Sequence, residues 1–271
     1  MLTCIICIGV LLVNGRLWRS QRRFTLSTFR DFGIGKTRFQ DDIAEEARSV
    51  TDELISRIND PFDLKQLLTN AISNVICAVV FGKRFKYNDT DFHTLLDTLD
   101  ESVKLSGSGG FKAVFPIIMK LDFKTKHRLE EISVILGATM RKMIVEHKDG
   151  FDPNNVNDYI DAYLRELQQG GSFENENLDE VSLQKTLVHL FAAGTETTVN
   201  TLRWALLYMM KYPDIQSRIQ REIDEVVGRN RLPRMSDKMP YTEATLMEVQ
   251  RIASIVPLGK TLTLGNISGA P

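Results

Sequence analysis

An unbroken helical pattern runs from Asp179 to Lys211 and constrains the fold more than any other feature of this 271-residue chain. Asp179 or Ser182 can cap the start of the helix, and Pro213 follows directly after its end. At a rise of about 1.5 Å per residue, roughly 30 residues span about 45 Å, the width of a large domain. The sequence therefore predicts one long helix that crosses the core.

The middle of the segment from Leu187 to Met210 does not have the composition of a buried helix. Gly194 costs a helix interior about 1 kcal/mol relative to alanine, and the neighbouring threonines add to that cost. Glu196 lies between apolar turns, so its carboxyl group must be paired, protonated or hydrated. Ala192 and Ala193, together with the glycine, open a shallow groove for a flat ligand beside an acid and a hydroxyl that can relay protons. The alternative is a polar helix face that packs against another polar face.

Helical periodicity with glycine or proline stops continues along most of the remaining chain. Helices are expected at residues 17–33, 39–58, 64–82, 91–107, 127–148, 158–171, 213–228 and 240–256. The second of these carries its apolar residues on one face, namely Phe39, Ile43, Ala47, Val50, Leu54 and Ile58. Strand signals are confined to the apolar residues 1–13 and the tail at 261–267. The predicted fold class is all-α with minor β.

The composition excludes several classes of function. A net charge of −1, with 43% hydrophobic and 25% charged residues, is ordinary for a globular protein and favours no nucleic-acid partner. Residues 1–13 are shorter than the ~20 of a membrane span, and no positive charge precedes them as in a signal peptide. Cys4, Cys7 and Cys77 are too few for a disulfide scaffold. Since no second pair follows Cys4-x-x-Cys7, two buried thiols are favoured over metal ligands.

Two further pairs carry little information when they are taken alone. Trp18 and Arg22 are one helical turn apart, and an indole N–H beside a guanidinium suits an anion, although a packing pair is commoner. Glu248 and Arg251 form an i,i+3 pair that by itself suggests a surface ion pair.

Taken together and in this order, W-x-x-x-R, A-G-x-E-T-T and E-x-x-R resemble the cytochrome P450 superfamily. The connecting segments "NGRLWRSQRRFTLSTFRDFGIGK", "AISNVICAVVFGKRF", "FAAGTETTVNTLRWALLYMMKYPDIQSRIQREIDEVVG" and "MPYTEATLMEVQR" resemble its microsomal family 2. The resemblance extends over about residues 8–259, and residues 260–271 form a divergent tail. It implies that residues 1–271 are a single partial P450 domain, the central part of that fold without the N-terminal anchor and sheet.

The resemblance implies a haem cofactor (iron protoporphyrin) and a role for each motif. Trp18 and Arg22 would bind a haem propionate, while Ala193 and Gly194 would let the porphyrin lie against the long helix. Glu196 and Thr197 would be the catalytic acid–alcohol pair that delivers protons during oxygen activation. Glu248 and Arg251 would form a structural pair on the haem side of the core. Residues 106–119 would lie at a substrate lid, and the substrate-facing residues would be His189, Phe191, Ala192, Val256 and Leu258.

The remaining family signature, F-x-x-G-x-R-x-C-x-G, supplies the cysteine that holds the iron, and it does not occur in this sequence. No metal ligand is therefore assigned, and we expect a partial chain that does not form the thiolate-ligated centre by itself.

The activity implied by the resemblance is monooxygenation of a lipophilic small molecule. Electrons would come from NADPH through NADPH–cytochrome P450 reductase, with cytochrome b5 as a further partner. The implied location is the cytoplasmic face of the endoplasmic reticulum membrane, although no transmembrane anchor is expected in this chain. The alternatives are a truncated, non-catalytic isoform that binds partners, and a plain all-α domain.

Overall fold

The computed structural model describes residue 10 and residues 15–33, 39–107, 122–169 and 178–255. All regular structure within these ranges is helical, which confirms the all-α prediction. The two segments with strand signals, 1–13 and 261–267, lie outside the described residues except for Val10. The helices are α1 (Gly15–Asp31), α2 (Gln40–Ser56), α3 (Leu64–Phe81), α4 (Thr90–Gly107), α7 (Phe123–Gly150), α8 (Tyr159–Gln168), α9 (Glu180–Lys211), α10 (Pro213–Val226) and α11 (Pro240–Ala253).

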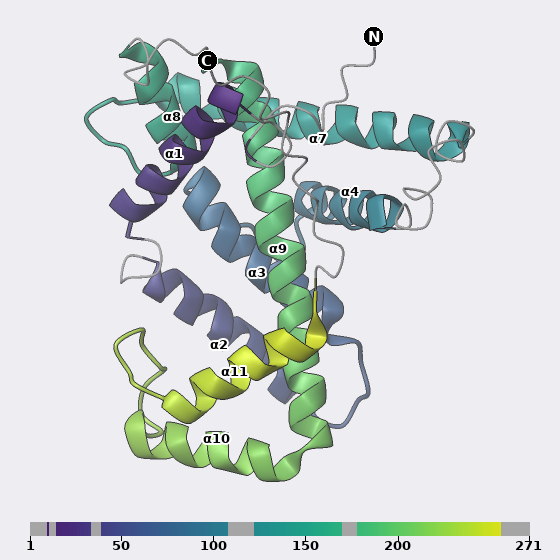
Figure 1. Cartoon of the computed structure of the whole chain (residues 1–271), viewed down its shortest axis with the longest axis vertical. Helices are drawn as coiled ribbons and strands as arrows, with labels where there is room; N and C mark the ends of the chain where they lie inside the picture. Colours follow the sequence, from purple (N-terminus) through teal and green to yellow (C-terminus); the bar gives the residue numbers. More distant parts are fainter. Residues whose placement is uncertain (1–9, 11–14, 34–38, 108–121, 170–177, 256–271) are drawn as a thin grey trace, which may run out of the picture.

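The long helix α9 is the axis of the fold, as the sequence predicts. The Asp179 carboxylate caps it by accepting the backbone N–H of Ser182, which decides between the two candidate caps. Tyr212 ends the helix, and Pro213 begins α10 at a sharp turn. Figure 1 shows α3 lying along α9, α7 and α4 on one side, and α10 and α11 crossing its C-terminal half.

The core forms where α3, α4, α7, α8 and the first half of α9 meet. The largest fully buried side chains there include Tyr159 and Tyr163 of α8. Their hydroxyls bind α1: the Gln21 side chain donates to Tyr163 at 2.9 Å, and Thr25 lies 2.8 Å from the Tyr159 hydroxyl. Phe24 packs edge-on against both rings. These contacts hold α1 on α8 and thereby fix the orientation of Trp18 and Arg22.

Helix α3 is the most apolar element. It is the one helix in the described part of the chain that is long and apolar enough to cross a membrane, and 61% of it is buried inside the fold. It packs along α9, and Gly82 ends it with a backbone φ of 60°, a left-handed conformation that favours glycine. These features are those of a core helix.

Helix α2 differs from the sequence expectation. Ile43 and Leu54 of the expected apolar face are 48% and 37% exposed, and Ile58, which lies past the end of α2, is 80% exposed, whereas Glu46 is only 4% exposed. The face of α2 that meets the rest of the molecule is therefore the one that carries this acid. The reason is a specific ion pair, since Glu46 accepts from Arg84 Nε and from the Tyr87 hydroxyl just after α3, each at 2.5 Å.

Candidate active site on the long helix

Ala193 and Thr197 form an exposed strip of small side chains near the middle of α9. The Thr197 hydroxyl donates to the carbonyl oxygen of Ala193 at 2.6 Å, and Thr201 repeats this bond to the Thr197 carbonyl at 2.8 Å. Since its proton is used within the helix, the outward side of the Thr197 oxygen is left as an acceptor. The strip can therefore seat a flat ligand and receive a hydrogen bond at the same place.

Glu196 lies beside this strip and is half-buried. Its carboxylate accepts from the Asn200 amide nitrogen at 3.3 Å, one turn further along α9. This hydrogen bond compensates the carboxylate for its position between apolar turns of the helix. Glu196 precedes Thr197 by one residue, which is about 100° around the helix axis, so its side chain lies on the flank of the strip.

Gly194 is placed differently from its neighbour Ala193. A Cβ atom added at Gly194 would lie 2.7 Å from Cδ1 of Ile76 on α3, which is closer than real Cβ atoms come to other atoms. The glycine therefore lets α3 pack directly against α9, and this packing explains it without a cofactor. Of the two residues expected to contact a porphyrin, Ala193 is the exposed one, while Gly194 brings the supporting helix close.

The residues expected to face substrate are distributed over several environments. Phe191 is fully buried in the core, with its ring centroid 6.0 Å from that of Phe81, so it presents no open surface. His189 is 8% exposed, and Ala192 is half-buried on the edge of the core. Val256 and Leu258 lie outside the described residues, as do the lid residues 108–119. Of this set, Ala192 lies nearest in sequence to the exposed strip.

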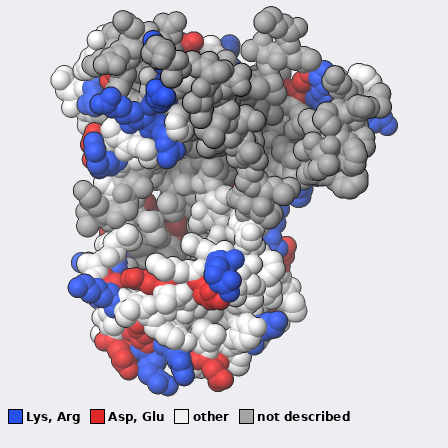
Figure 2. All heavy atoms as spheres, in the orientation of Figure 1, with Lys and Arg blue, Asp and Glu red and all other residues white. Residues whose placement is uncertain are grey.

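Trp18 and Arg22 share one face of α1, and the guanidinium carbon lies 5.5 Å from the centre of the indole ring. A surface groove of about 710 Å³ runs along this face, and Arg19, Arg23 and Arg30 also line it. Figure 2 shows Lys and Arg side chains gathered over α1. The chemistry of this face suits an anionic group such as a carboxylate.

Glu248 and Arg251 form a bidentate pair on α11, with both nitrogen–oxygen distances at 2.7 Å. Their side chains are 53% and 71% exposed in this structure. The hydrogen bond from the guanidinium lowers the pKa of Glu248, and the same bond raises that of Arg251. The geometry is that of the expected structural pair, whereas the environment is that of a surface pair.

Cys77 is the cysteine within the described residues, and it is fully buried in α3. Burial raises the pKa of its thiol well above the ordinary value, which disfavours the thiolate that binds iron. Among the described residues, the Ala193–Thr197 strip and the basic face of α1 have the chemistry that suits a porphyrin and its propionate, and the one described cysteine does not suit its iron.

Sequence reasoning missed a partly buried cluster where α7 ends and α8 begins. The ligand atoms of His147, Asp158 and Asp161 lie within 4.8 Å of one another, a spacing also found in metal sites. His147 and Asp158 are already paired at 2.9 Å, however, and the Asp158 side chain caps α8. The signals that could have found the cluster were a histidine in the last turn of a helix and an aspartate at the next N-cap.

Comparison with known proteins identifies the family of the chain. Residues 7–263 match the family Cytochrome P450, so the chain belongs to the cytochrome P450 family. It is similar to members of family 2. It is 41% identical to human Cytochrome P450 2J2 over 254 residues, which is 92% of this chain and 51% of that protein. It is 40% identical to rabbit (Oryctolagus cuniculus) Cytochrome P450 2B4 over 260 residues, or 93% of this chain and 52% of that protein. The chain thus spans about half the length of the curated relatives it matches.

Proposed function

We propose that this chain provides the oxygen-handling half of a haem-dependent monooxygenase that acts on a lipophilic small molecule. The observation that carries the proposal is the exposed Ala193–Thr197 strip of α9, with Glu196 directly beside it. A helix that crosses the core would otherwise cover such a strip with larger apolar side chains. Membership of the cytochrome P450 family supports the assignment.

One face of the porphyrin would lie against Ala193, because a methyl side chain allows a flat ring to approach the helix backbone closely. The Thr197 oxygen accepts outward, so it can hold a water molecule beside the cofactor and orient that water's proton. Glu196 would take up a proton from solvent and pass it to this water, because its half-buried carboxylate lies on the flank of the strip. A thiolate-ligated haem, for which cytochromes P450 are the standard example, would supply the reduction of dioxygen.

Trp18 and Arg22 would hold a propionate of the same cofactor. A cationic fork next to an indole N–H offers several donors in fixed directions, which suits a carboxylate better than a lysine would. Anchorage at α1 would be rigid, because Gln21 and Thr25 hydrogen-bond to the buried tyrosines of α8.

An exposed apolar surface extends along the C-terminal half of α9 and over α11. Trp204, Leu207 and Met210 are 40%, 47% and 70% exposed, and Met247 and Ile252 are 68% and 48% exposed. Large apolar surfaces of this kind mark contact regions. In the proposed enzyme this surface is covered by the part of the family domain that this chain does not match.

The proposed partners follow from the family. Electrons would come from NADPH through NADPH–cytochrome P450 reductase, with cytochrome b5 as a second donor, on the cytoplasmic face of the endoplasmic reticulum membrane. The basic face of α1 supports an acidic partner, since several arginines line one groove there.

The experiment that tests the proposal joins residues 1–255 to the C-terminal half of a family 2 relative. The joined protein should bind haem, give a thiolate-type Soret band with carbon monoxide after reduction, and hydroxylate lipophilic probes with NADPH and reductase. The 271-residue chain alone should give no such band. A folded joined protein that binds no haem would contradict the proposal.

A further inference from the structure

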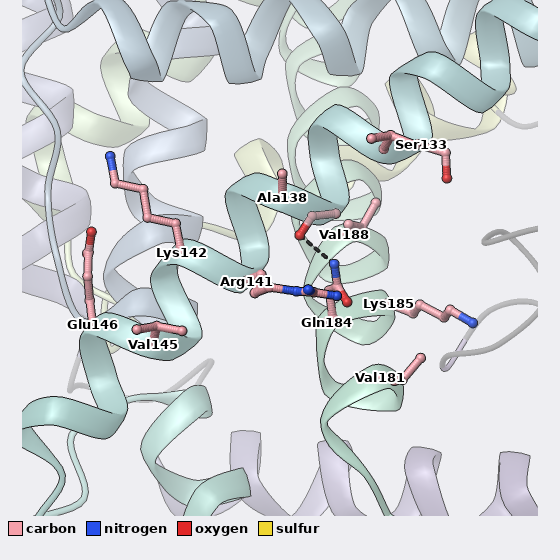
Figure 3. A pocket seen from close by; sticks show the side chains of 12 residues that line it. Ser133, Ala138, Arg141, Lys142, Val145, Glu146, Val181, Gln184, Lys185 and Val188 are labelled. Carbon is pink, nitrogen blue, oxygen red and sulfur yellow. Dashed lines mark hydrogen bonds between the residues drawn. The ribbon is translucent and has the colours of Figure 1, made fainter.

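A groove of about 820 Å³ lies between α7 and the first third of α9, away from the proposed haem site. Figure 3 shows side chains from both helices converging on it. Its volume is within the range of about 300–1,000 Å³ that is common for ligand pockets. Val188 in the groove and Thr197 lie on opposite sides of α9, because their separation is roughly two and a half turns at about 3.6 residues per turn.

The floor of the groove is aliphatic. Val134, Val145 and Val181 line it and are 65%, 47% and 48% exposed, and Ala138 and Val188 complete the surface. Exposed apolar surface between charged side chains is typical of a binding groove. The described residues that line the floor include no aromatic ring, so the floor suits a flexible hydrocarbon chain better than a flat ring.

The crossing that forms the groove is fixed by a specific contact. The Gln184 side chain of α9 donates to the carbonyl oxygen of Gly137 on α7 (Figure 3). A Cβ atom at position 137 would lie 2.8 Å from the Gln184 amide nitrogen, so a larger residue there would displace this amide from its hydrogen bond. The two walls of the groove are therefore held at a defined spacing before any ligand binds.

The charged side chains of the groove are mainly basic. Among the described residues, Glu146 is the one acid that lines it. Glu146 pairs with Lys83 at 3.0 Å, and Lys142 pairs with Asp91 at 3.2 Å. Arg141 and Lys185 have no ion-pair partner within the part of the chain that the structure describes, and Lys185 is only 7% exposed. A cation withdrawn from water without a counter-charge is unfavourable, so the groove favours an anion.

We propose that this groove binds a single-chain anionic amphiphile, taken up as a monomer from solution. The hydrocarbon chain would lie on the valine floor. The planar fork of Arg141 would bind a carboxylate or sulfate head group, with Lys185 adding positive charge. This site is distinct from the proposed monooxygenase site and does not depend on haem.

The test uses the full 271-residue chain and dodecanoate below its micelle concentration, with titration calorimetry as the readout. Dodecanol serves as the uncharged ligand of equal chain length. We expect one dodecanoate per chain and binding at least about 10-fold tighter than that of dodecanol. A diazirine-bearing dodecanoate should crosslink to α7 and to the first third of α9.

The double variant Arg141→Gln/Lys185→Gln removes the two cations and should weaken dodecanoate binding by about 10-fold or more, while dodecanol binding stays the same. The matched control is Arg221→Gln/Lys238→Gln, which changes net charge equally at exposed positions outside the groove and should bind as the wild type does. Ala138→Phe fills the groove at an exposed position and should weaken both ligands. Circular dichroism checks that each variant is folded.

Three results would overturn the proposal. Equal affinities for dodecanoate and dodecanol would remove the role of the cations. Crosslinks on the C-terminal half of α9 or on α11 would place the ligand on the exposed apolar surface of those helices. Binding to vesicles with anionic lipid that depends on Arg141 and Lys185, without binding of monomeric dodecanoate, would show a membrane contact instead.

Discussion

His147 and Asp158 join the last turn of α7 to the first turn of α8, with 2.9 Å between Nε2 and Oδ2. Nδ1 of the same imidazole lies 2.7 Å from the carbonyl oxygen of Met143. Both ring nitrogens face acceptors, so the ring is best satisfied when both carry protons. The carboxylate also lies against Gly82, where a Cβ atom would be 2.6 Å from Oδ2, so this one ion pair connects the ends of three helices.

The first prediction concerns the pH dependence of stability. Burial lowers the pKa of His147, but its hydrogen bond to Asp158 and the charge of that acid outweigh burial and raise the pKa. The ion pair therefore stabilises the fold fully below the ordinary histidine pKa of about 6.5, and this stabilisation is lost as pH rises through the higher folded pKa. The free energy of unfolding of His147→Gln should be lower by about 1–2 kcal/mol near pH 6, and the difference should shrink towards pH 9.

The matched control is His127→Gln. His127 also pairs with an acid, Glu131, but its side chain is 75% exposed, so its loss should leave the pH profile unchanged. Denaturant unfolding at several pH values measures both variants. If the free energies of unfolding of wild type and His147→Gln differ by the same amount across the pH range, the pair of charged His147 and Asp158 is not what stabilises the fold.

The second prediction concerns the buried acid of α2. Glu46→Ala would remove the acceptor of the Tyr87 hydroxyl and the closest acid of Arg84, which would keep only Glu45 at 3.4 Å and Ser49 at 3.3 Å. Breaking a buried pair costs about 3–5 kcal/mol, and since Arg84 is 39% exposed we expect about 2–4 kcal/mol. Glu45→Ala is the control, because Glu45 is 58% exposed and makes only the longer contact with the same Arg84, at 3.4 Å. Equal losses in the two variants would show that burial of Glu46 does not matter.

This helix also shows what the sequence could and could not predict. Periodicity located α2 correctly, because the positions of its residues around the helix axis follow from the sequence alone. It could not tell which face is buried, since the partners of Glu46 lie roughly 40 positions away and only the folded chain brings them together. Similarly, the three motifs were visible in the sequence, but the contact between Gly194 and Ile76 depends on how α3 crosses α9.

The third prediction separates the two small residues of α9. The new methyl group of Gly194→Ala would lie too close to Ile76, and such overpacking costs about 1–3 kcal/mol. Because alanine also gains about 1 kcal/mol in helix propensity, we expect the free energy of unfolding to fall by about 1 kcal/mol. Adding Ile76→Val should restore part of it. The side chain at position 193 is exposed, so Ala193→Leu should keep the free energy of unfolding of this chain within about 0.5 kcal/mol of the wild-type value. In the joined protein the same change should prevent haem binding. Haem loading of the Ala193→Leu joined protein would contradict its place at the porphyrin.

The fourth prediction concerns Glu248 and Arg251. In this chain both side chains are exposed, so Arg251→Lys should leave the melting temperature unchanged. In the joined protein, where we expect the pair to be covered, the same change should abolish stable haem incorporation, because lysine lacks the planar fork for two parallel bonds. Full haem loading of the joined Arg251→Lys protein would rule out the structural role.

The last prediction tests the role of Thr197 in the joined protein. Its hydroxyl donates to the Ala193 carbonyl at 2.6 Å, and its oxygen can accept a hydrogen bond from the outer side. Thr197→Ala removes this acceptor and leaves an exposed methyl group, and alanine forms helices better than threonine. Haem content and the spectral change on substrate binding should therefore stay near wild type. General acid–base positioning is typically worth about 10²–10⁴-fold, and water can replace part of it, so coupling of NADPH use to product should fall about 10-fold.

The electrons that no longer reach product should appear as hydrogen peroxide, whereas Thr197→Ser keeps the oxygen and should restore most of the coupling. Thr198→Ala is the matched control, because it removes a hydroxyl from the next exposed position of the same helix. When peroxide replaces NADPH and reductase, oxygen and protons arrive together, so the Thr197→Ala defect should become smaller. If Thr197→Ala couples as well as the wild type does, proton positioning is not its role, and the threonine then serves only to shape the surface of α9.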